Sequence, residues 1–236
     1  MMEKEVQDIA ANIRKVQETI ARSAEKSGRK PEDITLIAVT KTVEPERINE
    51  AIRCGITELG ENRVQELLGK YDQIENKENI HFHLIGRLQT NKVKYIIDKV
   101  TLIHSVDSQR LILEIEKQAA KHDKVQDILL EINLSGEPQK GGMPPEELDS
   151  ALQLCSTLSH VRVLGLMTVP PVADSLTKNS RYFQNLQQLF VDTCKKTYDN
   201  VHMSLLSMGM SADYDAAIES GSNMVRVGSA IFGKRK

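Results

Sequence analysis

The chain has 236 residues, and its 31 basic residues against 33 acidic residues leave it close to neutral. This length can bury one large hydrophobic core, and the balanced charge predicts no strong attraction to nucleic acid or to an anionic membrane. Four phenylalanines, five tyrosines and no tryptophan also leave little aromatic surface on which bases could stack.

The three cysteines, Cys54, Cys155 and Cys194, lie far apart in the sequence. They form no CxxC motif and have no pair of histidines nearby, so we expect neither a disulfide framework nor a metal site. The N-terminus leads into a charged segment, and no stretch reaches the roughly 18 uninterrupted apolar residues of a membrane-spanning helix. These features predict a cytoplasmic protein with no membrane partner.

An amphipathic pattern at the start of the chain predicts a helix over about residues 3–27. Its apolar residues recur at steps of three and four, at Val6, Ile9, Ile13, Val16 and Ile20. Gly28 and Pro31 end the pattern. The opposite face carries acids as well as bases and no aromatic anchor, so we expect residues 1–30 to pack on their own domain.

After this helix, short apolar runs alternate with amphipathic segments. The runs predict strands over residues 34–41, 58–61, 81–86, 102–107, 128–133, 161–169, 202–208 and 224–232. The segments between them predict helices over residues 45–54, 63–73, 90–99, 108–122, 144–158, 180–198 and 212–220. Continuous apolar strands separated by helices are typical of parallel strands buried on both faces. We expect surface loops over residues 75–79, 135–145 and 170–179.

This alternation predicts a (β/α)8 TIM barrel that forms a single domain over residues 1–236. Barrels of this class typically have about 250 residues, which agrees with the length and with the eight predicted strands. An open doubly wound sheet is the alternative fold. It would normally have fewer strands and a glycine-rich first turn, whereas the first turn here is Thr40-Lys41-Thr42-Val43.

Polar residues and glycines stand at the ends of most predicted strands. They are Lys41, Glu61, Asn62, His83, Gly86, Ser105, Asp107, Asn133, Ser207, Gly209, Ser211, Arg226, Gly228 and Ser229. The carboxyl ends of the strands of a parallel barrel meet around one opening. Polar groups there are costly unless they bind a ligand or one another. The pattern therefore favours a ligand site at this opening.

Lys41 follows the apolar run 34–40, which places an amine at the tip of a buried strand. Partial burial favours the neutral, nucleophilic amine that forms a Schiff base with a carbonyl compound. A lysine at a strand end can also extend into water without any function. Lys41 taken alone therefore does not decide between the two interpretations.

Arg226 lies inside the apolar run 224–228, where an unpaired guanidinium would be strongly penalised. The stretches 205–211 and 227–230 place hydroxyls and glycines after the last two strands, where this fold usually binds phosphate. Together with Lys41 they suggest a phosphorylated carbonyl ligand. Other roles remain open, because His83 could be a hydrogen-bonded core histidine and Asn62 could cap the following helix.

Six motifs, in order along the chain, carry a family resemblance. They are Ala38-Val39-Thr40-Lys41, Gly60-Glu61-Asn62-Arg63-Val64-Gln65-Glu66, His83-Leu84-Ile85-Gly86-Arg87-Leu88-Gln89-Thr90-Asn91-Lys92, Gly165-Leu166-Met167, Leu206-Ser207-Met208-Gly209-Met210-Ser211 and Val225-Arg226-Val227-Gly228-Ser229-Ala230-Ile231-Phe232-Gly233. They resemble the YggS/PROSC family of pyridoxal 5′-phosphate (PLP) homeostasis proteins, which are similar to the barrel domain of alanine racemase. Thr40 stands where the family more often has serine, and Phe82 where it often has tryptophan.

The resemblance implies a PLP site at the mouth of the barrel. It implies that Lys41 holds PLP as a Schiff base and that Ser207, Gly228 and Ser229 hold the phosphate. It also implies that Arg226 meets the pyridine nitrogen. A guanidinium stays protonated and can only donate, so it would leave this nitrogen unprotonated and the ring a weak electron sink.

Three further residues would line the pocket if the family pattern holds. The resemblance implies that Asn62 and His83 lie near the cofactor ring and that Met167 packs against it. None of these three would be a catalytic group.

The resemblance favours a PLP carrier without robust turnover, present as a monomer, that could pass PLP to apo-enzymes. Racemisation needs an acid or base on each face of the cofactor, and in alanine racemase the opposing tyrosine is associated with an additional C-terminal domain. The sequence ends at Lys236, three residues after the last of the six motifs, so we expect this chain to lack that tyrosine. The alternative is a racemase-like PLP enzyme that uses Lys41 with His83 or Tyr214. A third possibility is a barrel enzyme whose Lys41 reacts with a sugar phosphate.

Overall fold

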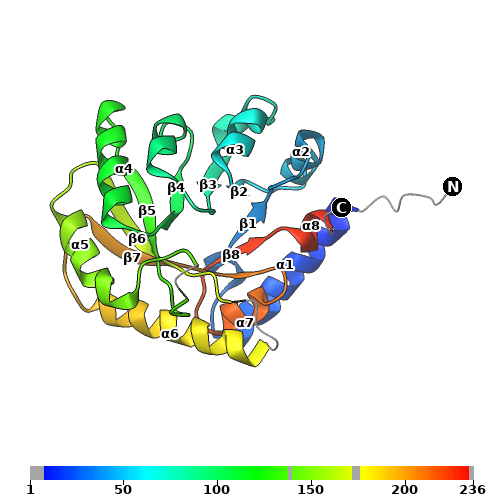
Figure 1. Cartoon of the computed structure of the whole chain (residues 1–236). Helices are drawn as coiled ribbons and strands as arrows, with labels where there is room; N and C mark the ends of the chain where they lie inside the picture. The colour runs from blue at the N-terminus through cyan, green and yellow to red at the C-terminus, as the bar shows by residue number, and fades with distance from the viewer. Residues whose placement is uncertain (1–7, 138–139, 172–175, 234–236) are drawn as a thin grey trace.

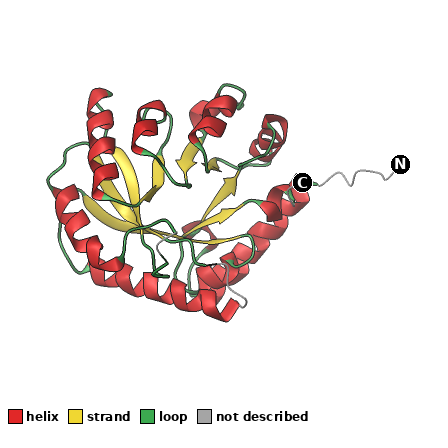
Figure 2. Ribbon diagram, viewed as in Figure 1, coloured by secondary structure: helices red, strands yellow, loops and turns green. Residues whose placement is uncertain are grey.

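The computed structural model describes residues 8–137, 140–171 and 176–233. In these ranges eight parallel strands, β1 to β8, close into a barrel in which each strand pairs with its neighbours in chain order. Helices surround the strands (Figure 1, Figure 2). The predicted TIM barrel is confirmed, and the open doubly wound sheet is excluded because β8 pairs with β1.

The strands occupy the predicted apolar runs with small differences in their bounds. They are β1 (Thr35–Val39), β2 (Glu58–Glu61), β3 (His81–Leu84), β4 (Leu102–Val106), β5 (Gln126–Glu131), β6 (Val161–Met167), β7 (Val201–Met210) and β8 (Met224–Val227). The largest difference concerns residues 224–232, which are not one strand. The chain leaves β8 at Gly228 and forms the short helix α8 (Ser229–Phe232), which buries Ile231 and Phe232 as a helical turn.

The helices also follow the predicted order. They are α1 (Ile9–Lys26), α2 (Pro45–Arg53), α3 (Val64–Tyr71), α4 (Gln109–Lys121), α5 (Leu148–Ser156), α6 (Leu176–Cys194), α7 (Tyr214–Glu219) and α8. The helix predicted over residues 90–99 is wrong, since the structure has only the 3₁₀ segment η3 (Thr90–Tyr95). β-Branched residues are frequent there and lower the helix propensity. No helix in the described ranges is long and apolar enough to cross a membrane.

Three predicted segments fall partly outside the described residues. They are the start of the first helix, including Val6, and parts of the loops 135–145 and 170–179. In the described part of the last loop the chain already enters α6 at Leu176, so the predicted loop is too long at its C-terminal end.

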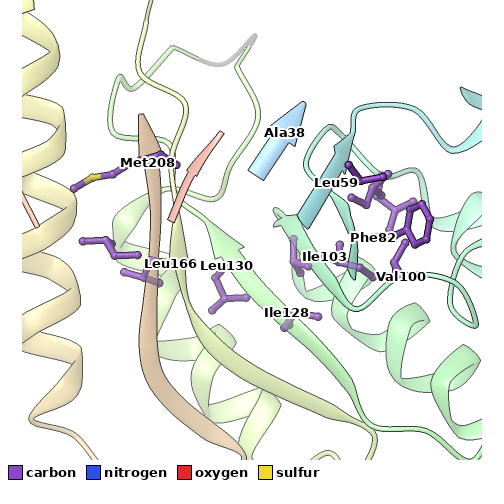
Figure 3. Close-up of a cluster of buried hydrophobic side chains, with 14 of the residues drawn as sticks. Ala38, Leu59, Phe82, Val100, Ile103, Ile128, Leu130, Leu166 and Met208 are labelled. Carbon is purple, nitrogen blue, oxygen red and sulfur yellow. The ribbon is translucent and has the colours of Figure 1, made fainter. Parts of the chain in front are cut away.

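Apolar side chains form two layers, one on each face of the sheet. The outer layer lies between strands and helices and includes Ala38, Leu59, Ile103 and Leu130 (Figure 3). The inner layer fills the barrel and consists of Ile37, Leu102, Leu129, Met167 and Met224. Successive residues of a strand point to opposite faces, so these two sets identify which strand positions face the barrel interior.

Helix α1 packs along α7 and α8, as its position in Figure 1 also shows. Its apolar stripe of Ile9, Ile13, Val16 and Ile20 is buried. Asn12 Nδ2 donates to the Ile231 carbonyl oxygen at 3.0 Å and so links α1 to α8. Residues 9–26 therefore lie against the last two helices of the barrel.

We predict that Gly165→Ala strongly destabilises the barrel. A Cβ atom at this position of β6 would lie 1.7 Å from the Leu205 carbonyl oxygen of β7, so the two strands would have to separate. We expect the free energy of unfolding, measured by urea denaturation, to fall by about 3 kcal/mol. The matched control is Gly69→Ala in α3, where an added Cβ meets nothing within 4 Å. It should gain about 0.5–1 kcal/mol, and equal stability of both variants would contradict the prediction.

Candidate functional site

Lys41 lies at the mouth of the barrel, two residues after the end of β1. Ile37 belongs to the inner apolar layer and Ala38 to the outer layer. Alternation along the strand therefore directs Val39 toward the barrel axis. Lys41 follows in the turn after β1 and is half-buried.

A buried polar network holds the ends of β1 and β2 from the outer side. Thr40 Oγ1 donates to Glu61 Oε1 at 2.7 Å, and Lys70 Nζ donates to the same oxygen at 2.9 Å and to the Thr40 carbonyl oxygen at 2.8 Å. Burial raises the pKa of Glu61, although the hydrogen bonds from Lys70 and Thr40 oppose this rise. The network fixes the backbone immediately before Lys41.

Asn62 follows Gly60, the partner of Val39, by two positions, so it lies at the same end of the barrel as Lys41. Its Oδ1 is buried and has no hydrogen-bond partner in the described part of the chain. An unsatisfied buried oxygen is costly, and a donor group of a ligand would relieve this cost. Asn62 is not the N-cap of α3, since Arg63 takes that position.

The turn after β8 lies beside the strand that carries Lys41. A Cβ atom at Gly228 would come 3.3 Å from Val39 Cβ, a tight contact that glycine avoids. The Gly228 and Ala230 N–H groups donate to Ser211 Oγ at 3.1 and 3.3 Å. Two backbone donors and one hydroxyl therefore converge at the start of α8, where Ser229 is exposed.

Arg226 points into the barrel and is 4% exposed. Its Nη1 donates to Ser207 Oγ at 2.5 Å and its Nη2 to the Thr168 carbonyl oxygen at 3.0 Å. Burial lowers the pKa of Arg226 to about 10, while Glu131 and Asp213 raise it. The guanidinium therefore stays protonated at neutral pH and acts only as a donor.

The structure separates two serines that the sequence motif presents together. Ser207 is fully buried, and its hydroxyl bonds to Arg226 and to His104 Nδ1 at 3.0 Å. The hydroxyl that meets the Gly228 turn belongs to Ser211. Between the two serines Gly209 has a φ of +92°, which interrupts the regular alternation of β7. The structure thus does not bring Ser207 together with the predicted phosphate-binding turn.

His83 and Met167 lie inside the barrel. His83 Nε2 is 2.6 Å from Glu58 Oε2, and its Nδ1 is 3.0 Å from His104 Nε2. Met167 is 1% exposed and belongs to the inner apolar layer. Sequence reasoning missed Glu58 and His104. The sequence did contain a signal for His104. This residue follows Leu102 by two positions in an apolar strand, so alternation directs both side chains to the same face of the sheet.

Glu131 is a further group at the mouth that the sequence interpretation missed within the predicted strand 128–133. It follows the inward-facing Leu129 by two positions and is 9% exposed. Burial, and to a lesser extent Asp107, raise its pKa to about 7, while Arg226 and Arg87 oppose the rise. Its carboxyl group can therefore hold or release a proton near neutral pH.

Comparisons with known proteins identify the family of this chain. The family model described as alanine racemase, N-terminal domain, matches residues 5–236. A pyridoxal phosphate homeostasis protein of Aquifex aeolicus is 45% identical over 224 residues, which cover 95% of this chain and 97% of that protein. The chain belongs to the pyridoxal phosphate homeostasis protein family. The resemblance found in its six motifs is confirmed.

Two solved structures are similar to the structure of this chain. The PipY protein of Synechococcus elongatus PCC7942, solved with PLP bound, superimposes with a TM-score of 0.85 at 28% identity and covers 96% of this chain and 100% of that chain. Alanine racemase of Clostridium difficile 630 has a TM-score of 0.71 at 20% identity and covers 95% of this chain but 57% of that chain. The second likeness shows the fold alone, and it confirms the alanine racemase-like barrel.

We predict that Glu131→Gln stabilises the protein in a pH-dependent way. The folded-state pKa of about 7 lies above the ordinary glutamate value of 4.5. The wild type therefore loses stability as pH rises through this interval, because the unfolded chain ionises first. The variant should unfold with a free energy up to about 3 kcal/mol higher than wild type at about pH 8, with no such gain near pH 4.

Urea denaturation at both pH values measures this difference. The control is Glu146→Gln, which replaces an exposed carboxylate. It should follow the wild type at each pH. A stability difference between Glu131→Gln and wild type that does not change with pH would contradict the predicted pKa.

Proposed function

We propose that this protein binds PLP as a Schiff base on Lys41 and serves intracellular PLP homeostasis as a carrier without robust catalytic turnover. The observation that carries the proposal is the pairing of β1 with β8, which puts the strand end with Arg226 and the Gly228 turn beside the strand that leads to Lys41. The PLP bound in the PipY structure, a protein of the same family and fold, supports PLP as the ligand.

The residues of the mouth fit the chemical groups of PLP. Lys41 supplies an amine for the aldehyde, and Arg226 supplies a charged donor for the pyridine nitrogen. The buried Asn62 Oδ1 offers an acceptor that the described part of the chain leaves unsatisfied. His83 and Met167 remain predicted lining residues of the cofactor pocket. His83 lies inside the barrel, below its mouth. When bound, PLP supplies an electrophilic carbon and an electron-withdrawing ring.

For the phosphate we propose Gly228 and Ser229 together with Ser211. The two backbone N–H groups that meet the Ser211 hydroxyl support this choice. Ser207 was the serine expected from the motif. Its hydroxyl accepts a hydrogen bond from the buried Arg226, so we propose that it supports the guanidinium instead.

The contacts of the two residues considered as a second base support a carrier more than a racemase-like enzyme. Both ring nitrogens of His83 form hydrogen bonds within the barrel. Tyr214 is 9% exposed and packs in the outer apolar layer, on the helix side of the sheet. The proposed role of Arg226 also favours a carrier, because a donor to the pyridine nitrogen keeps the ring a weak electron sink.

The remaining parts of the proposal concern the setting of this function. We propose that the chain acts as one PLP-binding domain over residues 1–236, as a monomer in the cytoplasm. PLP-dependent apo-enzymes are the proposed recipients. A reversible covalent bond suits such a carrier, because an incoming amine can displace Lys41 and release the cofactor.

We predict that Lys41 is the residue that carries PLP. Borohydride reduction of the PLP-loaded protein, followed by peptide mapping, should place the label on Lys41, because reduction makes the Schiff base permanent. Lys41→Ala should lose both the label and the yellow colour. The matched control is Lys117→Ala on α4, which removes a lysine that is 63% exposed and should keep both.

Label on a different lysine would overturn the assignment to Lys41. The same two variants test the carrier role in assays with a panel of D- and L-amino acids. We expect no steady-state turnover by the wild type. Turnover that Lys41→Ala abolishes and Lys117→Ala preserves would replace the carrier by an enzyme.

We predict that Ser211 recognises the phosphate. Ser211→Ala should raise the Kd for PLP by about 3- to 10-fold, because it removes one neutral hydrogen-bond partner. Pyridoxal lacks the phosphate, so its Kd should not change. Ser207→Ala should instead weaken both ligands to a similar extent, since it acts through Arg226. Fluorescence or absorbance titration measures these constants, and the opposite pattern would return the phosphate to Ser207.

A further inference from the structure

An unbroken chain of hydrogen bonds crosses the interior of the barrel. It joins side chains of β2, β3, β4, β7 and β8, in the order Glu58, His83, His104, Ser207 and Arg226. The successive distances are 2.6, 3.0, 3.0 and 2.5 Å. Strands β4 and β7 do not pair in the sheet, so the contact between His104 and Ser207 spans the barrel.

The donors and acceptors of this chain match in one direction when both histidines are neutral. Arg226 can only donate, so Ser207 Oγ accepts from it and directs its own proton to His104 Nδ1. His104 then carries its proton on Nε2 and donates to His83 Nδ1. His83 in turn donates from Nε2 to the Glu58 carboxylate. Every proton in the chain therefore has an assigned atom.

The opposite direction requires a buried charge. If His104 donated to Ser207 from Nδ1, its Nε2 would have to accept from His83 Nδ1. His83 would then donate from both nitrogens, to His104 and to the ionised Glu58 carboxylate, and would be a cation. Ser207 would also accept two hydrogen bonds and leave its own proton without an assigned acceptor. The neutral arrangement avoids both costs.

The electrostatics of the chain agree with this arrangement. His104 is fully buried, and burial, then His83 and Arg226, hold its pKa well below 6.5. At the other end burial raises the pKa of Glu58, but hydrogen bonds from His83 and His81 outweigh it, so the net pKa is lowered. A neutral His104 therefore lies between a carboxylate at one end of the hydrogen-bond chain and a guanidinium at the other.

An interior made only of apolar side chains would avoid the desolvation cost of these groups. The polar chain ends on Arg226, the member that the proposed function assigns to the pyridine nitrogen. We propose that Glu58, His83 and His104 are positioning residues that act through Ser207 to hold the Arg226 guanidinium in one orientation toward the pyridine ring. The part that concerns PLP rests on the proposed function.

The proton arrangement can be tested without any cofactor. Nitrogen NMR of the histidine-labelled apo-protein distinguishes protonated from unprotonated ring nitrogens. We expect His83 and His104 both to be neutral with the proton on Nε2. A proton on Nδ1 of His104, or a cationic His83, at neutral pH would overturn the arrangement.

The positioning role is tested with Glu58→Gln, which keeps the shape of the side chain but removes the charged acceptor. We expect the Kd for PLP to rise about 10-fold, the size of effect typical of residues that orient a ligand-binding side chain without touching the ligand. We also expect the absorbance maximum of the bound cofactor to shift. The control is Glu116→Gln on α4, which removes the charge of a carboxylate 2.9 Å from His160 outside the barrel interior and should change neither quantity.

Wild-type affinity and wild-type absorbance in Glu58→Gln would overturn the positioning role. Circular dichroism establishes that the variant is folded, and a shifted absorbance maximum separates a local effect on the ring from a loss of stability. If the wild-type protein itself binds no PLP, the proposed function fails, while the NMR measurement still decides the hydrogen-bond arrangement of the apo-protein.

Discussion

The pairing of β1 with β8 is the constraint on which the rest of the site depends. It joins residues 35–38 to residues 224–227, almost the full length of the chain apart, and closes the barrel. Closure brings Gly228 against Val39 and turns the start of α8 toward the strand that carries Lys41. An open sheet of the same strands would leave these groups on opposite edges, and no site could form between them.

Closure also creates an interior that has to accommodate a charge. Arg226 is paired with the Ser207 hydroxyl and the Thr168 carbonyl oxygen, which makes its burial tolerable. Glu131 and Asp213 add favourable charge from the mouth. The inner apolar layer fills the remaining space, so the guanidinium has few alternative orientations. Packing and electrostatics thus both hold the Arg226 guanidinium below the mouth of the barrel.

This arrangement separates binding from catalysis. An amine, a charged donor and a turn with converging N–H groups are sufficient to hold a phosphorylated aldehyde. Catalysis of racemisation would further need an acid or base on each face of the bound group and a strong electron sink. In the proposed site Arg226 opposes the second requirement, and the contacts of His83 and Tyr214 oppose the first. The alanine racemase fold is therefore compatible with a protein that holds the cofactor without using it.

The sequence by itself determined the barrel and the strand ends, because alternation of apolar runs and helices is a local property that each segment carries alone. It also placed Lys41, Arg226 and Gly228 at those ends. Only the tertiary structure distinguished Ser207 from Ser211, because Gly209 breaks the alternation of β7 in a way that spacing does not reveal. The hydrogen-bond chain likewise links His104 of β4 to Ser207 of β7, strands distant in sequence, so this contact exists only once the barrel closes.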